Sequence, residues 1–450
     1  MNSAESDRSQ VGVVGSGPAG LAAAFRLRQA GLRVRVFEAS DRVGGKMRTS
    51  VRDGFVIDEG ASVLPSAYTS LLGVINDAGL TGELTPGATS FGIAGDRGVQ
   101  AMDTAHLLRS AAGFRLVSAR SSIKMTKVVW DLLRMRTHLA SGQASDAAPL
   151  DTESAGDYAR RRLNPELMEY VVDPAVRALV GKSADEVSSI EFFYALRMFI
   201  GTRFLAFRQG MATYPDRLAG LFDVELQARV VQVEQLGDEV QVIWQGARGV
   251  EHVERLAGCV VAVPGTAVAP MVPGLDAKRA EFLRQLSYTK MVNLSVGLSR
   301  PPTVPIAYIY VTRAVHPGLD GLLQEHVKLS GRAPAGKGLL GLYTMSDWAE
   351  ELFNYDDEDI IDKALEAADR ILPGTSSTVE FATVHRWDPM VVHRAPGHYR
   401  KLAAFNQRCQ SLDTLVQLAG DYIYASNLNG ATAAGEQAAR RILSALAGRL

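Results

Sequence analysis

The apolar positions near the start of the chain predict strands that alternate with helices. Residues 11–14 are continuously apolar, which is typical of a strand buried on both faces of a parallel sheet. The alanine- and leucine-rich residues 21–30 predict a helix, and residues 33–37 predict a second strand. Because parallel strands need a crossover connection, this order predicts an α/β fold.

The middle of the chain has a different pattern. Between residues 67 and 200, Ala, Leu and Arg recur at i, i+3 and i+4 spacing, which predicts helices. Between residues 288 and 380, alternating positions predict an antiparallel sheet with one covering helix. The strands expected there are 291–298, 306–311 and 338–344, and the helix is 356–371. Further strands are expected at 224–234, 258–263 and 415–419.

The length of the chain predicts two closely packed domains, because 450 residues with 47% hydrophobic content can bury a large core. One domain is expected to be discontinuous and to carry the parallel strands. It consists of residues 1–75, 205–285 and 386–450. The other consists of a helical part, residues 76–204, and a sheet part, residues 286–385, which would form the floor of a substrate cavity.

Composition and charge exclude several classes of function. The formal net charge of −1 gives no overall electrostatic reason to expect a nucleic-acid partner. The first ten residues lack the apolar segment of a signal peptide, and no stretch approaches the roughly 18–20 apolar residues of a membrane span, so we expect a cytoplasmic protein. Cys259 and Cys409 are too few for a disulfide framework, and no His/Cys cluster predicts a metal site.

The most specific motif is a glycine-rich turn between the first strand and the first helix. It consists of Gly15, Ser16, Gly17, Pro18, Ala19 and Gly20. Gly15 permits the tight turn, Gly17 allows the backbone to approach a pyrophosphate, and Gly20 allows the helix to pack closely on the strand. The N-terminus of the helix offers N–H groups and a positive dipole to the phosphates.

An acidic residue follows the second strand. Glu38, with Ala39 after it, lies about 20 residues after the glycines, where a carboxylate can bind both hydroxyls of an adenosine ribose. The same carboxylate argues against a 2′-phosphate. Strand, glycines, helix and acid together predict a dinucleotide ligand, either NAD or FAD.

The residues that follow resemble a known family. Residues 41–49 (DRVGGKMRT) are similar to an extension found in flavoproteins of the amine oxidase and protoporphyrinogen oxidase superfamily. In that family the second glycine pair and the basic residue lie against the FAD pyrophosphate, which implies this role for Gly45 and Lys46. The resemblance implies a Rossmann-like FAD-binding domain of the GR2 type, interleaved with a substrate domain of mixed antiparallel sheet plus helices. Cys409 does not match the cysteine that holds flavin covalently in some members, so we expect non-covalent FAD.

Further segments resemble the same superfamily. The cofactor-binding residues that they imply are Gly60, Ala61, Ser62, Val230, Trp387, Gly420, Asp421, Asn429 and Ala431. The small residues at 60–62 would pass beside the isoalloxazine ring, with an ordinary hairpin as the alternative. Val230 would contact the adenine through its backbone, and Asp421 the ribityl or phosphate region. The last helix would direct its dipole at the N1/C2=O edge of the flavin.

Lys290 is the candidate catalytic residue. It begins the strand expected at 291–298, and in the amine oxidase branch a lysine in this setting holds a water against flavin N5 and helps oxygen react with the reduced ring. A cation there would also stabilise developing superoxide. The alternative is an exposed lysine, because the protoporphyrinogen oxidase branch lacks this residue.

Two residues are candidates for the substrate pocket. Arg394 lies where residues 386–398 depart from the protoporphyrinogen oxidase pattern, and it would either bind a substrate carboxylate bidentately or be a surface residue. Asn427 occupies the position of the second of two aromatic residues that flank the flavin in monoamine-type oxidases. We therefore expect that aromatic pair to be broken.

Basic residues are concentrated in residues 107–137, where Asp131 is the only acidic residue. A basic amphipathic segment with Trp130 and Phe114 could lie on an anionic membrane surface, and the corresponding region of some protoporphyrinogen oxidases is membrane-associated. The alternative is a solvated helical face.

The resemblance implies an FAD-dependent oxidase. It would remove a hydride from a carbon next to nitrogen, in a hydrophobic amine or a nitrogen-containing ring, with O2 as acceptor and H2O2 as product. A porphyrinogen oxidase or C–C desaturase is the alternative, and a flavin isomerase or mutase without net redox chemistry is a third. The sequence predicts neither the identity of the substrate nor the oligomeric state.

Overall fold

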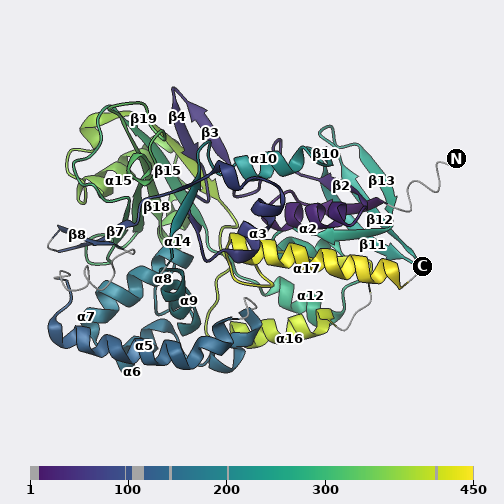
Figure 1. Cartoon of the computed structure of the whole chain (residues 1–450), viewed down its shortest axis with the longest axis horizontal. Helices are drawn as coiled ribbons and strands as arrows, with labels where there is room; N and C mark the ends of the chain where they lie inside the picture. Colours follow the sequence, from purple (N-terminus) through teal and green to yellow (C-terminus); the bar gives the residue numbers. More distant parts are fainter. Residues whose placement is uncertain are drawn as a thin grey trace.

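The computed structural model describes residues 10–96, 98–103, 116–140, 144–199, 202–410 and 414–448. Two sheet-containing regions lie at opposite ends of the long axis, and a helical layer runs along one side (Figure 1). The first strand and the C-terminal helix lie in the same region (Figure 1). The chain therefore leaves this region and returns to it.

Among the described residues, five parallel strands form the first sheet, in the order β10-β2-β1-β14-β20. Their bounds are Gln10–Val14 for β1, Arg33–Phe37 for β2, Asp223–Glu225 for β10, Gly258–Val261 for β14 and Val416–Leu418 for β20. The predicted parallel sheet is present, and its strands come from all three segments that were expected to share a domain. The domain boundaries themselves stay a prediction.

Helices α2 (Pro18–Gln29) and α17 (Leu428–Ala447) lie side by side on this sheet (Figure 1). Small residues allow the close approach: a Cβ added to Gly435 would lie 2.0 Å from the carbonyl oxygen of Ala19. Each helix follows the carboxyl end of a parallel strand. Both helix N-termini therefore lie at the same edge of the sheet.

Residues 224–234 were predicted as one strand, and this prediction is wrong because β10 ends at Glu225. Gln227 then adopts a left-handed φ of 54°. The N–H of Ala228 donates to the carbonyl of Glu38 at 2.8 Å, which ties the turn to the end of β2. The chain continues in a separate antiparallel sheet, formed by β11 (Arg229–Leu236), β12 (Glu239–Gln245) and β13 (Glu251–Leu256).

Seven strands in the described part of the chain form the second large sheet, in the order β19-β15-β18-β17-β16-β7-β8. Their bounds are Val379–Trp387 for β19, Met291–Leu298 for β15, Gly338–Thr344 for β18, Leu319–Gln324 for β17, Tyr308–Val311 for β16, Ser90–Gly95 for β7 and Gly98–Asp103 for β8. Neighbouring strands are antiparallel except β16 and β7. Helix α15 (Asp357–Asp369) covers one face, where Ile360 and Ala364 share a core with Leu294 and Leu342.

Strands β7 and β8 lie within residues 76–204, where helices were predicted. Their sequences, SFGIAG and GVQAMD, are rich in glycine and alanine and lack the β-branched alternation that marks a strand. The parallel pairing of β7 with β16 makes β7 part of the sheet. Pairing with a strand that is distant in the sequence, and not the local pattern, thus makes these residues strands.

Helices form most of residues 116–199. Their bounds are Ala119–Ala140 for α5, Ala155–Arg162 for α6, Pro165–Leu167 for α7, Asp173–Val180 for α8 and Ser189–Phe199 for α9, with a π turn at Met168–Val172. Tyr158, Phe192 and Phe193 pack ring against ring and belong to the same hydrophobic core as β1 and β14. The helical layer therefore shares a core with the parallel sheet. None of the helices among the described residues has the length and apolar character that crossing a bilayer requires.

Shorter elements connect these layers. The strands are β3 (Thr49–Arg52), β4 (Phe55–Asp58), β5 (Leu64–Pro65), β6 (Leu84–Pro86) and β9 (Phe204–Phe207). The helices are α3 (Thr69–Asp77), α10 (Thr213–Ala219), α11 (Gly265–Met271), α12 (Ala277–Arg284), α13 (Glu325–Lys328), α14 (Ser346–Leu352) and α16 (His398–Gln410), with 3₁₀ turns at Thr81–Glu83, Ala144–Leu150 and Ser376–Thr378.

Candidate active site

A cavity of about 960 Å³ lies at the carboxyl ends of the parallel strands. The loops after β1, β2, β14 and β20 all contribute to its wall, which is the edge where open parallel sheets bind ligands. We call this part, lined by residues 15–19, 38–39, 228–231 and 262–264, the nucleotide arm. The cavity continues to a sheet arm, lined by residues 308–310, 320–323 and 343 and by residues from α8 and α9. One cavity thus joins a candidate nucleotide site to a second part that is lined by the second sheet.

The turn after β1 leaves room for a ligand. Gly15 has a φ of 95°, and a Cβ there would lie 2.6 Å from the carbonyl oxygen of Ala262. At Gly17, by contrast, an added Cβ would meet no atom within 4 Å. Gly17 is the N-cap of α2, and no side chain caps this helix. The dipole and first N–H groups of α2 therefore offer a position for an anion such as a pyrophosphate.

Glu38 lies at the end of β2 and is 8% exposed. Its Oε2 accepts hydrogen bonds from the N–H and hydroxyl of Ser16 at 2.9 and 2.5 Å, and its Oε1 accepts from the N–H and hydroxyl of Ser40, both at 2.8 Å. Burial alone would raise the pKa of Glu38, but these hydrogen bonds outweigh it and hold the pKa below its ordinary value. Both hydroxyls can rotate away, which would free acceptor positions for two ribose hydroxyls.

The start of β11 forms a further side of the nucleotide arm. Val230 lines it and is 5% exposed, and Val263, Pro264 and Met271 add apolar surface. This apolar wall has the character that a purine ring requires. The position of Val230 is compatible with the predicted adenine contact, which stays a prediction.

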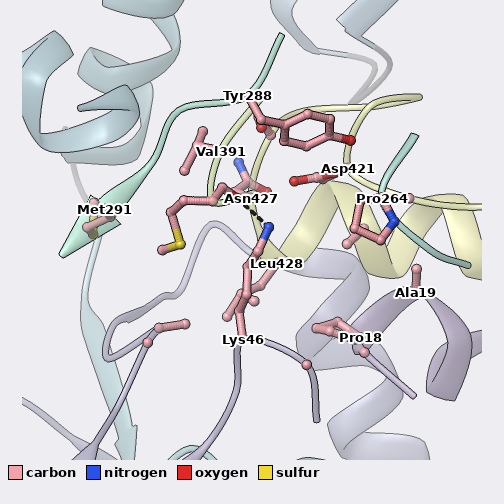
Figure 2. Close-up of a pocket in the computed structure, with 18 of the residues that line it drawn as sticks. Pro18, Ala19, Lys46, Pro264, Tyr288, Met291, Val391, Asp421, Asn427 and Leu428 are labelled. Carbon is pink, nitrogen blue, oxygen red and sulfur yellow. Dashed lines mark hydrogen bonds between the residues drawn. The ribbon is translucent and has the colours of Figure 1, made fainter. Parts of the chain in front are cut away.

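Lys46 lies at the centre of the cavity, with Asp421 and Asn427 nearby (Figure 2). Its ammonium donates to the carbonyl oxygen of Met390 and lies 6.0 Å from the centre of the Tyr288 ring. Burial lowers the pKa of Lys46, while the negative charge of Asp421 acts in the opposite direction. A partly buried cation thus lines the cavity.

The small residues that were predicted beside the ring, Gly60, Ala61 and Ser62, all line the cavity. Buried charges anchor this turn to the second sheet. Lys328 donates from Nζ to the carbonyl of Ser62 at 2.8 Å, and Arg332 pairs with Asp58 at 3.0 Å. Because these three charged side chains are at most 1% exposed, the ion pairs hold the turn firmly.

Asn427 caps the N-terminus of α17, accepting a hydrogen bond from the N–H of Gly430 at 2.9 Å. Asn427, Leu428 and Ala431 line the cavity. Figure 2 shows Asn427 and Leu428 close to Lys46. The positive end of a second helix dipole therefore faces the cavity.

Aromatic residues line the sheet arm, and sequence reasoning missed them. Tyr308 and Tyr310 lie on β16, and Tyr343 lies on β18. Burial raises the pKa of each, so all three stay neutral. The hydroxyl of Tyr343 lies 3.0 Å from that of Ser62, which joins this arm to the turn at 60–62. The alternation of Tyr308 and Tyr310 on an expected strand was the available signal.

Lys290 does not reach the cavity, which corrects its prediction as a group beside the flavin. Its Nζ lies 3.0 Å from a carboxylate oxygen of Asp388 and 5.1 Å from the centre of the Phe353 ring. The next residue, Met291, lines the cavity. Lys290 directly precedes β15, and its ion pair with Asp388 holds the side chain away from the cavity.

Three predicted cofactor residues support the cavity without lining it. Trp387 donates from Nε1 to the carbonyl of Glu59 at 3.0 Å, next to the turn at 60–62. Asn429 accepts hydrogen bonds at Oδ1 from the first N–H groups of α3, at 2.8 and 3.2 Å. Gly20 packs on the strand, since a Cβ there would lie 1.8 Å from the carbonyl oxygen of Gly15. The other predicted cofactor residues, and Asn427, all line the cavity.

Arg394 is neither a surface residue nor part of the cavity wall, so both expectations for it are wrong. It is 1% exposed and donates to the carbonyl oxygens of Asp421, at 2.9 Å, and Tyr424. Its guanidinium lies 3.6 Å from Glu191. Arg394 therefore holds the loop after β20, which carries Asp421 to the cavity.

The chain is similar in sequence to a known protein family and to several characterised enzymes. The family model described as flavin containing amine oxidoreductase matches residues 18–443. Over 182 residues the chain is 31% identical to protoporphyrinogen oxidase 2 (chloroplastic/mitochondrial) of Arabidopsis thaliana, a match that covers 40% of this chain and 34% of that protein. It is 21% identical over 450 residues to coproporphyrinogen III oxidase of Bacillus subtilis (strain 168), covering 92% of this chain and 93% of that protein.

The same fold occurs in a solved structure. Cyclohexylamine oxidase from Brevibacterium oxydans IH-35A superposes with a TM-score of 0.77 at 18% identity, covering 98% of this chain and 99% of that one. At this identity the likeness establishes the fold alone. The match to the plant protoporphyrinogen oxidases spans only about a third of their length.

Proposed function

The chain belongs to the family of flavin-containing amine oxidoreductases, and from that premise we propose that it is an FAD-dependent oxidase of a hydrophobic amine or a nitrogen-containing ring. The observation that carries the proposal is the single cavity in which the nucleotide arm meets the aromatic sheet arm. A cofactor held along the parallel sheet would present its ring to a substrate held by the second sheet.

The residues of the nucleotide arm fit FAD. The open space at Gly17 and the N-terminus of α2 would hold the pyrophosphate, and Glu38 would bind the ribose. The apolar wall at Val230 would hold the adenine, while Lys46 and the turn at 60–62 would lie near the flavin. Neither Cys259 nor Cys409 lines the cavity among the described residues, which supports non-covalent binding.

When bound, FAD would supply hydride acceptance from a C–H bond next to nitrogen, with O2 as the final acceptor and H2O2 as product. The protein contributes orientation and electrostatics. Tyr308, Tyr310 and Tyr343 would hold an apolar substrate and exclude water. The N-terminus of α17 would stabilise negative charge at the adjoining edge of the cofactor. The chain needs no general base if the substrate amine reacts in its neutral form.

A porphyrinogen oxidase or a C–C desaturase is the second candidate. The near full-length match to coproporphyrinogen III oxidase supports it. A non-redox isomerase or mutase is a third possibility, which would show neither reduction of the flavin nor peroxide formation.

Anaerobic titration of the purified flavoprotein tests the proposal. Hydrophobic amines and porphyrinogens are added separately, bleaching of the flavin spectrum is recorded, and peroxide is assayed after air is readmitted. Bleaching by an amine followed by peroxide is the expected result. Bleaching by porphyrinogens alone would favour a porphyrinogen oxidase over an amine oxidase. If neither kind of compound bleaches the flavin, neither function is supported.

We also propose that α5 makes peripheral contact with anionic membranes. On this helix Ile123, Trp130 and Leu133 are 71%, 59% and 54% exposed. Lys127 lies between Ile123 and Trp130 in the sequence, and Arg134 directly follows Leu133. Residues 107–115 of the predicted basic segment lie outside the described residues. An apolar stripe with flanking cations suits the interface of a bilayer.

Co-sedimentation with vesicles tests the membrane proposal. Binding should require about 30% anionic lipid and fall severalfold in Trp130→Glu. Equal binding of the parent protein and the variant, or no binding by the parent protein, would contradict this proposal.

A further inference from the structure

Asp320 is a buried carboxylate in the sheet arm that the proposed chemistry does not use. It lies on β17, where the pairing with β18 shifts between Leu319 and Gly321, so Asp320 is the extra residue of a bulge. A bulge changes the direction in which a side chain points, and Asp320 lines the cavity. Asp320 is 7% exposed, and its Oδ1 has no hydrogen-bond partner among the described residues.

Asp320 forms no ion pair with any residue in the described part of the chain. The guanidinium of Arg177 lowers the pKa of Asp320 through its charge, but it donates its hydrogen bonds to the carbonyl oxygens of His316, Pro317 and Leu319, at 3.1, 3.0 and 2.8 Å. It also lies 3.7 Å from Asp173. The charged form of a buried carboxyl group is unfavourable without an ion-pair partner, so Asp320 either keeps its proton or gains the opposite charge from a ligand.

The surroundings of Asp320 indicate the shape of that ligand. The next residue, Gly321, pairs with Tyr343 of β18 on one side and with Tyr310 of β16 on the other. The carboxylate of Asp320 therefore lies beside a wall of aromatic residues. That wall extends to Ser62 through the hydroxyl of Tyr343. A substrate that reaches from the turn at 60–62 to Asp320 would pass its apolar part along these tyrosines.

We propose that Asp320 binds a second, cationic nitrogen of the substrate, at a distance from the carbon that is oxidised. The substrate class is then an amine that carries another basic nitrogen beyond an apolar spacer. This inference rests on the proposed function, because it takes the reacting end of the substrate to lie beside the flavin.

The charge distribution of the cavity supports this class over a polycarboxylate. Among the described lining residues the cations are Lys46 and Arg229, and neither belongs to the sheet arm. A porphyrinogen with carboxylate side chains would find Asp320 there and no lining cation. Its carboxylates would be repelled where a second ammonium would be attracted.

Titration of Asp320 gives the binding a characteristic pH dependence. Burial raises the pKa of Asp320 to about 7, with Arg177 lowering it and Asp173 raising it. The phenol of Tyr310 also faces this carboxylate, and burial raises its pKa, so it stays neutral. Binding of a dication should therefore strengthen between pH 6 and pH 8, as Asp320 loses its proton.

The test compares α,ω-diaminoalkanes of four to eight carbons with 1-aminoalkanes of the same length. Dissociation constants are measured by anaerobic calorimetry on the holoenzyme at pH 8, and bleaching of the flavin is recorded in parallel. The parent protein should bind the best diamine at least roughly tenfold more tightly than its matched monoamine. In Asp320→Asn this preference should fall below roughly threefold.

Two variants control for folding and charge. Asp347→Asn removes a carboxylate that is 72% exposed on α14 and should keep the preference of the parent protein. Asp320→Glu keeps the charge but extends it by one methylene, so the optimal diamine should become shorter. Flavin content confirms that each variant is folded.

The outcomes separate this inference from the proposed function. Diamine preference without bleaching would leave Asp320 as the cation site and contradict amine oxidation. Bleaching by amines without diamine preference, or equal preference in Asp320→Asn, would overturn the role of Asp320. A carboxylate-bearing porphyrinogen that binds more tightly than every diamine would also overturn it.

Discussion

The ammonium of Lys290 lies 3.0 Å from a carboxylate oxygen of Asp388, and this pair directs the lysine away from the cavity. The next residue, Met291, is the first residue of β15 and lines the cavity instead. A shift of one residue along a strand thus separates a residue that faces the candidate site from one that does not.

Replacement of Lys290 by Met should leave the reaction of the reduced flavin with oxygen nearly unchanged, within about twofold, because the side chain does not reach the cavity. The half-exposed ion pair with Asp388 should contribute less than about 1 kcal/mol to the free energy of unfolding. Stopped-flow reoxidation of the reduced protein measures the first quantity. A decrease of tenfold or more would restore a role beside the ring.

Replacement of Glu38 by Gln should weaken FAD binding roughly 10- to 100-fold, because a hydrogen bond to a charged group contributes about 1.5–3 kcal/mol. The pKa of Glu38 lies below its ordinary value, so the carboxylate stays charged and FAD affinity should not decline through this group between pH 8 and pH 5. Quenching of flavin fluorescence by the apoprotein gives the dissociation constant.

The matched control for Glu38 is Glu225→Gln, on the neighbouring strand β10. Glu225 is 40% exposed in its side chain, pairs with Arg35 at 3.0 Å and does not line the cavity. Its replacement should change FAD affinity by less than about threefold. Equal affinity losses in the two variants would refute the ribose assignment.

The roles of Gly17 and Gly20 in the glycine turn can be separated by alanine substitutions. Gly17→Ala meets no atom within 4 Å, so the apoprotein should lose less than about 1 kcal/mol of stability while FAD affinity falls at least tenfold. Gly20→Ala would bring a Cβ to 1.8 Å from the carbonyl of Gly15 and should destabilise the apoprotein by about 1–3 kcal/mol or more. Thermal unfolding and FAD titration distinguish them, and an unstable Gly17→Ala apoprotein would contradict this division of roles.

Asp320 should make the parent protein less stable as pH rises. Burial raises its pKa in the folded state to about 7, above the unfolded value, so the folded state holds the proton longer and stability declines from the unfolded pKa up to the folded pKa. Between pH 5 and pH 7 this amounts to at most about 3 kcal/mol. Asp320→Asn should lack this decline. Urea unfolding at several pH values measures it, and identical pH profiles of parent and variant would contradict the buried charge.

Local sequence signals predicted the nucleotide arm well. Residues 15–19 and Glu38 line the nucleotide arm, and the small residues at 60–62 line the same cavity. Each was predicted from its own backbone or short side chain, and its role toward a ligand stays a prediction. Strands β15 and β18 match the predicted ranges 291–298 and 338–344, since strict hydrophobic patterning marks them.

The sheet arm could not be predicted in the same way. Its character depends on which face of each strand is turned inward and on the bulge at Asp320, which no local pattern specifies. Arg394 and Asn429 were assigned to ligands by their neighbours in the sequence. Instead, Arg394 binds backbone carbonyls of the loop after β20, and Asn429 binds backbone N–H groups of α3. Long-range hydrogen bonds of this kind depend on the completed fold.

The most direct test of the central claim is the identity and amount of flavin released when the purified holoprotein is precipitated with acid. The cavity predicts about one FAD per chain in the supernatant and no flavin in the precipitate. FMN in place of FAD, flavin that stays with the precipitated chain, or an apoprotein that takes up no FAD would contradict the account.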